Sequence, residues 1–400
     1  MKNKGQGCCN RSTLLLNQGV KKMELYIHIP FCVRKCAYCD FLSFPQTKEI
    51  MQQYVEKLIE EIRWAGKQYP DRAISSIFIG GGTPSILKAE QMTAIMYAVR
   101  EAFYIEETAE ISIEANPGTV TEEKLRAYRN VGINRISFGL QSAEPKELKL
   151  LGRIHTYEEF LESYQMARSC GFDNINVDLM SALPGQTVES WEETLTRVAK
   201  LEPEHISAYS LIIEEGTPFY EKYGEERGEG ILPDEDSERE MYHRTKAILR
   251  NMGYERYEIS NYAKPGKECR HNVGYWTNVP YLGLGLGASS YVDGCRFSNE
   301  SDLEAYLQQE PGKRFDESIL SEKDKQEEYF FVGLRLVRGV SVKGFEEQFG
   351  VTAESVYPGL MARLIDEGGA EFDENDRDYF RLTEYGMDVS NYIMVQFLQS

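Results

Sequence analysis

Six short apolar runs alternate with amphipathic stretches between about residues 25 and 212, and this alternation limits the fold more than any other feature. The runs are rich in β-branched and aromatic residues, as strands are, and they lie at 25–29, 74–79, 109–114, 133–138, 174–180 and 205–213. Apolar residues recur at helical spacing between them, so we expect helices near 47–68, 88–104, 121–131, 157–170 and 187–200. Strands alternating with helices predict parallel βαβ units, hence an α/β fold. An open doubly wound sheet and a full or partial (β/α) barrel both fit, and both place the ligand site at the carboxyl ends of the strands.

The pattern changes beyond the sixth run. A helix candidate and a glycine-rich stretch at 281–294 come first, and from Ser321 helices surround one polar hairpin at 370–382, which is typical of a winged-helix-like module. Residues 1–22 lack periodicity, so we expect a disordered tail there, with Met23 as an alternative start that the intact mass of the natively expressed protein would test. We therefore expect four segments: the tail (1–22), a core (23–235), an extension (236–310) and a C-terminal winged-helix-like domain (311–400).

The net charge of the chain limits the classes of partner that it can bind. The formal net charge is -19, which disfavours non-specific binding to nucleic acids and anionic membranes. No run of eighteen apolar residues is present, and the N-terminal apolar stretch is too short for a signal peptide, so we expect a cytoplasmic protein without a nucleic-acid partner. Eight cysteines are too sparse for a disulfide framework; three lie close together, which favours a metal site in a reducing compartment.

The clustered cysteines form a C-x3-C-x2-C motif directly after the first run, at Cys32, Cys36 and Cys39. Three thiolates on one loop can bind three irons of a [4Fe–4S] cluster and leave the fourth iron open for a chelating ligand. Arg34 and Lys35 bring positive charge, which favours the thiolate forms.

Two other interpretations of the motif are a zinc knuckle and three buried free thiols. Zinc would need a fourth ligand, and His28 is the nearest candidate. However, His28 alternates with Ile27 and Ile29 in an expected strand, where packing is the more common role. Spacing and context together favour the cluster.

The string from Tyr26 to Phe41 closely resembles the radical S-adenosylmethionine (SAM) branch that contains oxygen-independent coproporphyrinogen III oxidase. The resemblance runs from about residue 24 to the C-terminus and includes residues 381–386. It implies a partial (β/α)6 TIM-type radical SAM barrel with a C-terminal helical, winged-helix-like domain. It also implies that SAM chelates the open iron through its amino and carboxylate groups.

The resemblance also implies a set of SAM contacts, of which several make physical sense on their own. Glycines in Gly80–Thr83 would let the backbone approach a ligand closely, Arg153 could neutralise a carboxylate, and Asp178 needs a partner inside its apolar strand. A tight turn, a solvated loop acid at Glu114 and a core tyrosine at Tyr26 are the structural alternatives. The expected contacts are Tyr26, Gly81, Gly82, Thr83, Glu114, Gln141, Arg153 and Asp178.

Two departures separate the chain from the oxidases. They carry a further cysteine where this chain has Phe41, and a longer functional N-terminal region. The string His271-Asn272-Val273-Gly274-Tyr275-Trp276 instead resembles the heme chaperone (HemW-like) branch. Imidazole is a common axial ligand of heme, Tyr275 and Trp276 offer flat apolar area, and Gly283–Gly287 could lie against a macrocycle. The alternative is that His271 only hydrogen-bonds in the fold; His155, His205 and His243 are further imidazoles.

We therefore expect a heme chaperone that binds heme through His271, Tyr275 and Trp276 and passes it to an acceptor protein, with respiratory proteins among the candidates. SAM would gate or power the transfer, or be cleaved. Enzymatic activity and a homodimer are left open. Coproporphyrinogen decarboxylation is the first alternative, and a DNA-binding iron–sulfur regulator is the second. Residues 321–400 hold 16 Asp and Glu against 8 Lys and Arg, which counts against DNA.

Overall fold

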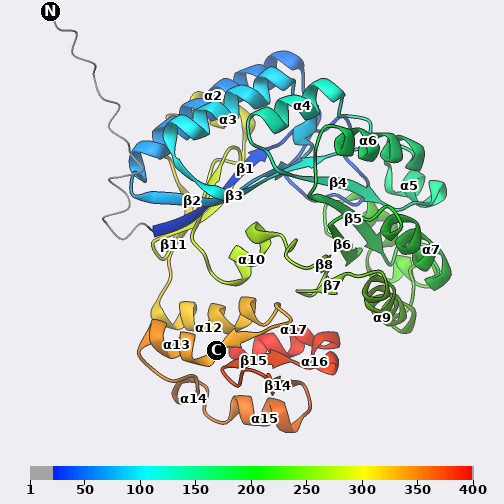
Figure 1. Ribbon diagram of the computed structural model, residues 1–400, viewed down its shortest axis with the longest axis vertical. Coiled ribbons are helices and arrows are strands. Elements are labelled where there is room, and N and C mark those ends of the chain that lie inside the picture. The colour runs from blue at the N-terminus through cyan, green and yellow to red at the C-terminus, as the bar shows by residue number, and fades with distance from the viewer. Residues whose placement is uncertain (1–20, 399–400) are drawn as a thin grey trace, which may run out of the picture.

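The computed structural model describes residues 21–398, and its main feature is a curved twelve-stranded sheet (Figure 1). Six consecutive strands pair in parallel, each with the next along the chain. They are β1 (Lys21–Ile29), β2 (Arg72–Gly81), β3 (Tyr104–Ala115), β4 (Arg135–Gln141), β5 (Ile175–Ser181) and β6 (His205–Ser210). The predicted partial (β/α)6 barrel is confirmed, and the open doubly wound sheet is excluded by the sequential strand order.

Helices cover the convex face of the sheet (Figure 1). The five that were expected lie within two residues of their predicted bounds: α2 (Lys48–Gln68), α3 (Ala89–Ala102), α4 (Glu122–Asn130), α6 (Tyr157–Ser169) and α7 (Val188–Ala199). Threonine side chains cap four of them at residues 47, 121, 156 and 187, which satisfies backbone N–H groups that have no partner within the helix. On α7 the predicted apolar face is buried, with Trp191, Leu195 and Val198 fully enclosed.

Short elements extend the sheet and close its ends. Beyond β6 lie β8 (Asn261–Ala263) and β7 (Glu255–Arg256); beyond β1 lie β9 (Tyr281–Leu284), β10 (Ser289–Val292), β11 (Cys295–Ser298) and β12 (Phe315–Ile319). Segment 236–310 therefore adds strands to both edges of the core sheet. The remaining helices are α5 (Pro145–Leu151), α8 (Pro218–Tyr223), α9 (Glu235–Asn251) and α11 (Leu303–Gln308), with 3-10 turns η1 (Pro84–Ile86) and η2 (Glu225–Gly228). One helix, α10 (Arg270–Trp276), lies on the concave side (Figure 1).

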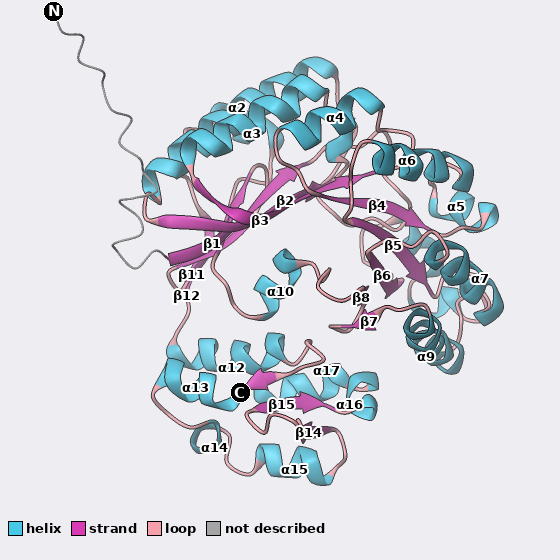
Figure 2. Ribbon diagram, viewed as in Figure 1, coloured by secondary structure: helices cyan, strands magenta, loops and turns pink. Residues whose placement is uncertain are grey.

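The C-terminal part has its own apolar core around Phe330, Phe345 and Phe397. Its helices pack on a small sheet in the order β13-β15-β14 (Figure 2), and β14 and β15 form the predicted hairpin. The strands are β13 (Val340–Ser341), β14 (Ala370–Phe372) and β15 (Tyr379–Leu382). The helices are α12 (Glu322–Gly333), α13 (Val342–Phe349), α14 (Ala353–Val356), α15 (Leu360–Asp366), α16 (Glu384–Asp388) and α17 (Ser390–Met394), followed by η3 (Val395–Phe397).

The N-terminal segment and the absence of a membrane-spanning helix among residues 21–398 complete the description of the fold. The tail expected at 1–22 lies outside the described residues except for Lys21 and Lys22, which begin β1. Within the described range, no helix combines the length and apolar character that spanning a membrane requires.

Candidate functional site

The cysteine loop connects β1 to α2 and is fastened to the end of β2. The backbone N–H of Gly82 donates to the carbonyl of Ile29 at 2.9 Å, and that of Thr83 donates to Phe31 at 2.7 Å. A Cβ on Gly82 would lie 2.7 Å from the Phe31 carbonyl oxygen, so only glycine permits this approach. The glycine run thus holds the loop in place.

The three thiols of this loop, Cys32, Cys36 and Cys39, are free and partly exposed. Within residues 21–398, no three His, Cys, Asp or Glu side chains converge closely enough to hold a single metal ion. A cubane cluster binds each thiolate on a different iron, so its ligands lie further apart than those of one ion. Three free thiols on one loop are a donor set that a [4Fe–4S] cluster can use.

His28, the candidate for a fourth zinc ligand, uses both of its ring nitrogens in hydrogen bonds within the protein. His28 Nδ1 bonds to the Tyr26 hydroxyl at 3.0 Å, and Nε2 donates to the Leu42 carbonyl at 2.9 Å. The imidazole is buried between them. His28 therefore has no nitrogen left to bind a metal.

Positive charge reaches the thiols from two sides. Lys35 is exposed, donates to the Phe41 carbonyl at 3.0 Å and lowers the pKa of the Cys39 thiol as expected, but burial outweighs this effect and raises that pKa. The Arg153 guanidinium also approaches the sulfur of Cys36, with Nη1 at 3.5 Å from Sγ. Arg153 comes from the loop after α5, 117 residues away, and so could not be paired with Cys36 by local spacing.

A cavity of about 260 Å³ opens over the three sulfurs. It brings together seven of the eight side chains or glycines expected to contact SAM: Gly81, Gly82, Thr83, Glu114, Gln141, Arg153 and Asp178. Tyr26 is the exception, since it lines a neighbouring pocket. Asn116, Ser137 and Tyr209 also line the cavity; they could not be predicted, because a single polar residue in or after a strand carries no distinguishing pattern.

Two carboxyl groups face each other in this cavity. Glu114 accepts the N–H of Gly81 at 3.0 Å, and burial together with Asp178 raises the pKa of Glu114 to about 8. Asp178 accepts hydrogen bonds from Ser137 at 2.9 Å and from Asn176 at 2.8 Å, which supplies the partners that its apolar strand required. A cationic ligand group would find two acceptors here.

Arg153 and Gln141 form the opposite wall. Arg153 Nη2 donates to Asn116 at 2.6 Å and to the carbonyl of Gly139, while its buried Nε has no hydrogen-bond partner. Gln141 adopts a left-handed backbone conformation (φ 75°) and accepts the Tyr209 hydroxyl at 2.9 Å. Strained backbone of this kind concentrates at ligand sites, and the positive charge of Arg153 in the cavity wall favours an anionic ligand group.

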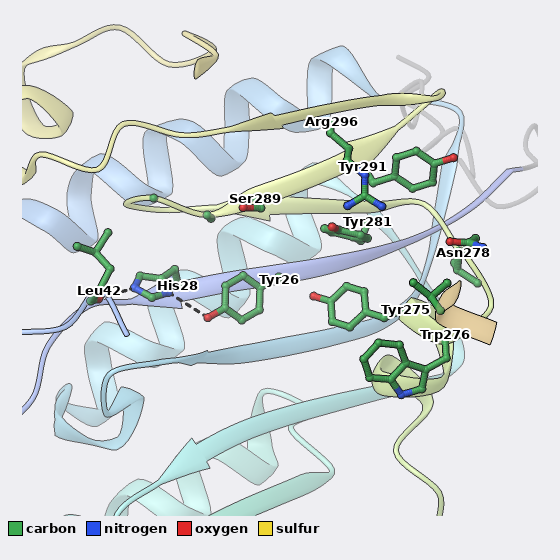
Figure 3. A pocket seen from close by; sticks show the side chains of 14 residues that line it. Tyr26, His28, Leu42, Tyr275, Trp276, Asn278, Tyr281, Ser289, Tyr291 and Arg296 are labelled. Carbon is green, nitrogen blue, oxygen red and sulfur yellow. Dashed lines mark hydrogen bonds between the residues drawn. The ribbon is translucent and has the colours of Figure 1, made fainter. Parts of the chain in front are cut away.

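A second pocket, of about 440 Å³, lies beside the first and is walled by aromatic rings (Figure 3). Its aromatic lining residues are Tyr26, Tyr275, Trp276, Tyr281 and Tyr291, and Arg296 supplies a positive charge. The Tyr275 and Tyr281 rings meet edge to face with centroids 4.7 Å apart. The indole Nε1 of Trp276 has no hydrogen-bond partner. The pocket thus offers flat apolar surface with one cation.

His271 stands behind this wall and not in it. It is 1% exposed, Nδ1 bonds to the Ser76 hydroxyl at 2.7 Å, and Nε2 bonds to the Tyr275 hydroxyl at 3.0 Å. Burial and the nearby Arg135 lower the pKa of His271 to about 3, so the imidazole is neutral. Of the three motif residues, Tyr275 and Trp276 reach the pocket; His271 has no nitrogen free for iron in this conformation.

The glycine-rich stretch is used mainly for packing. A Cβ on Gly283 would lie 2.3 Å from the Ser289 carbonyl oxygen, and one on Gly285 would lie 2.7 Å from that of His28. Within Gly283–Gly287, Gly287 is the glycine that lines the aromatic pocket. Gly287 is therefore placed to lie against a ligand in the pocket, while Gly283 and Gly285 allow the strands at this edge to pack closely.

Comparisons with known proteins give consistent results. Residues 26–198 match the radical SAM superfamily and residues 320–389 match the HemN C-terminal domain. The chain is 38% identical to "Heme chaperone HemW" of Lactococcus lactis (94% of this chain, 98% of the relative) and 36% identical to that of Bacillus subtilis (93% and 98%). The solved structure of coproporphyrinogen III oxidase (HemN) from Escherichia coli superposes with a TM-score of 0.83 at 25% identity, covering 97% of this chain and 93% of that one.

Proposed function

The chain belongs to the HemW family within the radical SAM superfamily, and on this premise we propose that it binds heme and passes it to an acceptor protein. The observation that carries the proposal is the aromatic pocket, because two residues of the H-N-x-x-Y-W motif form its wall. Relatives named heme chaperone HemW match the chain over nearly their whole length, and the motif lies inside that match.

The pocket suits a porphyrin in shape and chemistry. The rings of Tyr275, Trp276 and Tyr281 present apolar area against which a flat macrocycle can stack. Arg296 lies 5.2 Å from the centroid of the Tyr291 ring and pairs with Glu328 at 2.9 Å. Its guanidinium can bind a propionate at the rim. We infer that heme occupies this pocket with its propionates towards Arg296.

We also infer a resident [4Fe–4S] cluster on Cys32, Cys36 and Cys39 with SAM beside it. Such a cluster leaves one iron open to SAM and can supply an electron to it when reduced. The chain contributes the fixed loop, acceptors at Glu114 and Asp178, and the buried guanidinium of Arg153 described above. Free thiols in this loop need a reducing compartment, so we place the protein in the cytoplasm.

The two pockets share a wall. Tyr26 lines the aromatic pocket while its hydroxyl bonds to His28. The His28 ring packs on Gly81, where an added Cβ would lie 2.4 Å from a ring carbon, and Gly81 lines the cysteine cavity. A ligand that moves Gly81 would therefore move His28 and Tyr26 as well. We propose that this contact is how the SAM site influences heme binding or release.

Coproporphyrinogen decarboxylation is not favoured. The matched HemN structure is a fold neighbour at 25% identity, whereas the relatives of 36–38% identity carry the chaperone name. Phe41 stands where the oxidases have a further cysteine, so the rim of the cavity carries an exposed phenyl ring there in place of a thiol.

A transfer assay tests the proposal. Protein purified anaerobically with its cluster is loaded with heme and mixed with an apo b-type cytochrome, whose Soret band reports heme arrival. The proposal expects a rate that rises with acceptor concentration, because transfer requires contact between the two proteins. A rate that equals passive release to a heme scavenger at every acceptor concentration would contradict it. Turnover of coproporphyrinogen III in a parallel sample with SAM and reductant would favour the oxidase.

A further inference from the structure

A tyrosine–histidine pair connects the aromatic pocket to the core of the barrel. Tyr275 and His271 are four residues apart on α10 and so lie on the same face of the helix. The Tyr275 hydroxyl bonds to His271 Nε2 at 3.0 Å, and the two rings meet edge to face with centroids 4.8 Å apart. Figure 3 shows the Tyr275 hydroxyl on the side of Tyr26, within the pocket.

Behind the pair lies a buried carboxyl group. His271 Nδ1 is 2.7 Å from the Ser76 hydroxyl and 3.7 Å from Oε2 of Glu24. Glu24 is 3% exposed, Ser76 also bonds to it, and its Oε2 lacks a hydrogen-bond partner. The series Tyr275, His271, Ser76 and Glu24 thus forms a path by which a proton can leave the pocket.

No imidazole is free to bind an iron in this pocket. All five histidines of the chain belong to the described residues, and only His28 among them lines the pocket, with both nitrogens bonded. His205 is bonded at both nitrogens elsewhere, His243 pairs with Asp388 at 3.1 Å, and His155 lines a different pocket. Phenol oxygens are the ligands that remain, and a tyrosine oxygen is an established ligand of heme iron.

We propose that Tyr275 is the axial ligand of the iron of ferric heme in this pocket and that His271 is the residue that positions and deprotonates it. This inference rests on the proposed function and refines it. As the bond from Tyr275 Oη to iron forms, the O–H bond breaks and His271 Nε2 takes the proton. The Nδ1 proton of His271 passes through the Ser76 hydroxyl to the Glu24 carboxyl in its ionised form, so the imidazole stays neutral. Burial raises the pKa of Glu24 to about 8, so ionised Glu24 binds this proton readily and the step is favoured as the pH rises towards 8. In the H-N-x-x-Y-W motif, the tyrosine is then the iron ligand and the histidine is the base that deprotonates it.

Tyr26 provides a matched comparison. It lines the same pocket and its hydroxyl also bonds to an imidazole, that of His28 at 3.0 Å. However, the other nitrogen of His28 donates to the carbonyl of Leu42, which cannot take up a proton. The Tyr26 pair therefore has a hydrogen bond without an onward path.

Ferric heme added to the full-length protein and to three variants tests the assignment. Wild-type protein should show the phenolate–iron vibrations in resonance Raman spectra and a phenolate-to-iron charge-transfer band. Tyr275→Phe should lose both and bind heme at least about tenfold more weakly, whereas Tyr26→Phe should keep both. His271→Gln retains a hydrogen-bonding group without a base, so it should keep the phenolate bands but shift the phenolate–iron frequency. Circular dichroism and melting temperature confirm that each variant folds.

The spectra distinguish failure of the Tyr275 assignment from failure of the proposed heme binding. An imidazole–iron signature in the wild type that His271→Gln abolishes would assign the ligand to His271 and overturn the inference while leaving the proposed function intact. Phenolate bands that survive Tyr275→Phe and disappear in Tyr26→Phe would do the same in favour of Tyr26. Absence of saturable heme binding by the wild type would overturn the proposed function itself.

Discussion

Replacing Gly82 with alanine should cause loss of the cluster while the protein still folds. An alanine Cβ would lie 2.7 Å from the Phe31 carbonyl oxygen and 3.0 Å from that of Ile29. Both oxygens accept the hydrogen bonds that fasten the cysteine loop to β2. The loop must therefore move away, and Cys32, one residue beyond Phe31, must move with it.

The size of the effect follows from the contacts that are lost. Relieving an overpacked contact costs about 1–3 kcal/mol, and weakening two hydrogen bonds costs roughly 1 kcal/mol each. The fold tolerates such a loss, so we expect the melting temperature to fall by only a few degrees. Cluster assembly requires all three thiolates in place, so iron and sulfide per chain should fall by more than half after anaerobic reconstitution.

Gly171→Ala is the matched control. Gly171 has φ +87° with no atom within 4 Å of an added Cβ, so alanine there costs about 1–2 kcal/mol of backbone strain far from the cysteine loop. This variant should lose stability but keep its iron. If Gly82→Ala retained a full complement of iron and sulfide, the reasoning that close contact with β2 fixes the loop would be refuted.

Three further predictions concern the two pockets. Burial raises the pKa of Glu114, and also that of Glu24, from the ordinary 4.5 to about 8, so the melting temperature of the apo-protein should fall between about pH 5 and 8. Glu114→Gln should reduce that slope by removing one of the two groups. Arg153→Lys removes the donors to Asn116 and Gly139, so SAM affinity measured by calorimetry should drop at least about tenfold. Trp276→Ala removes a ring from the pocket wall and should weaken heme binding about tenfold in a Soret titration, whereas SAM affinity should not change.

Much of the barrel could be predicted because the pattern of apolar residues in its strands and helices shows which faces are buried. The β5 segment is rich in apolar residues and is covered on both faces, and the α7 stripe matches a helix packed on one side. The edge strands β9–β12 were missed because each has only four or five residues, too few to show a period. β9 pairs with β1, and β10, β11 and β12 are added to β9 in turn; no local pattern reveals the long-range pairing of β9 with β1.

The cysteine cavity was predicted more completely than the aromatic pocket. Its residues follow the ends of consecutive parallel strands, and the topology alone brings such positions together. The aromatic pocket instead depends on how α10 sits inside the curved sheet. That placement turns His271 towards Ser76 on β2 and leaves Tyr275 at the surface of the pocket, and the motif alone could not distinguish the two orientations.

Equilibrium titration of ferric heme into the anaerobically reconstituted protein, followed at the Soret band, shows whether this chain carries heme in its aromatic pocket. We expect saturation at one heme per chain, with affinity reduced in Trp276→Ala and cluster content equal in both proteins. Soret absorbance that rises without saturation, or saturates equally in the variant, would contradict the claim that this chain carries heme in its aromatic pocket.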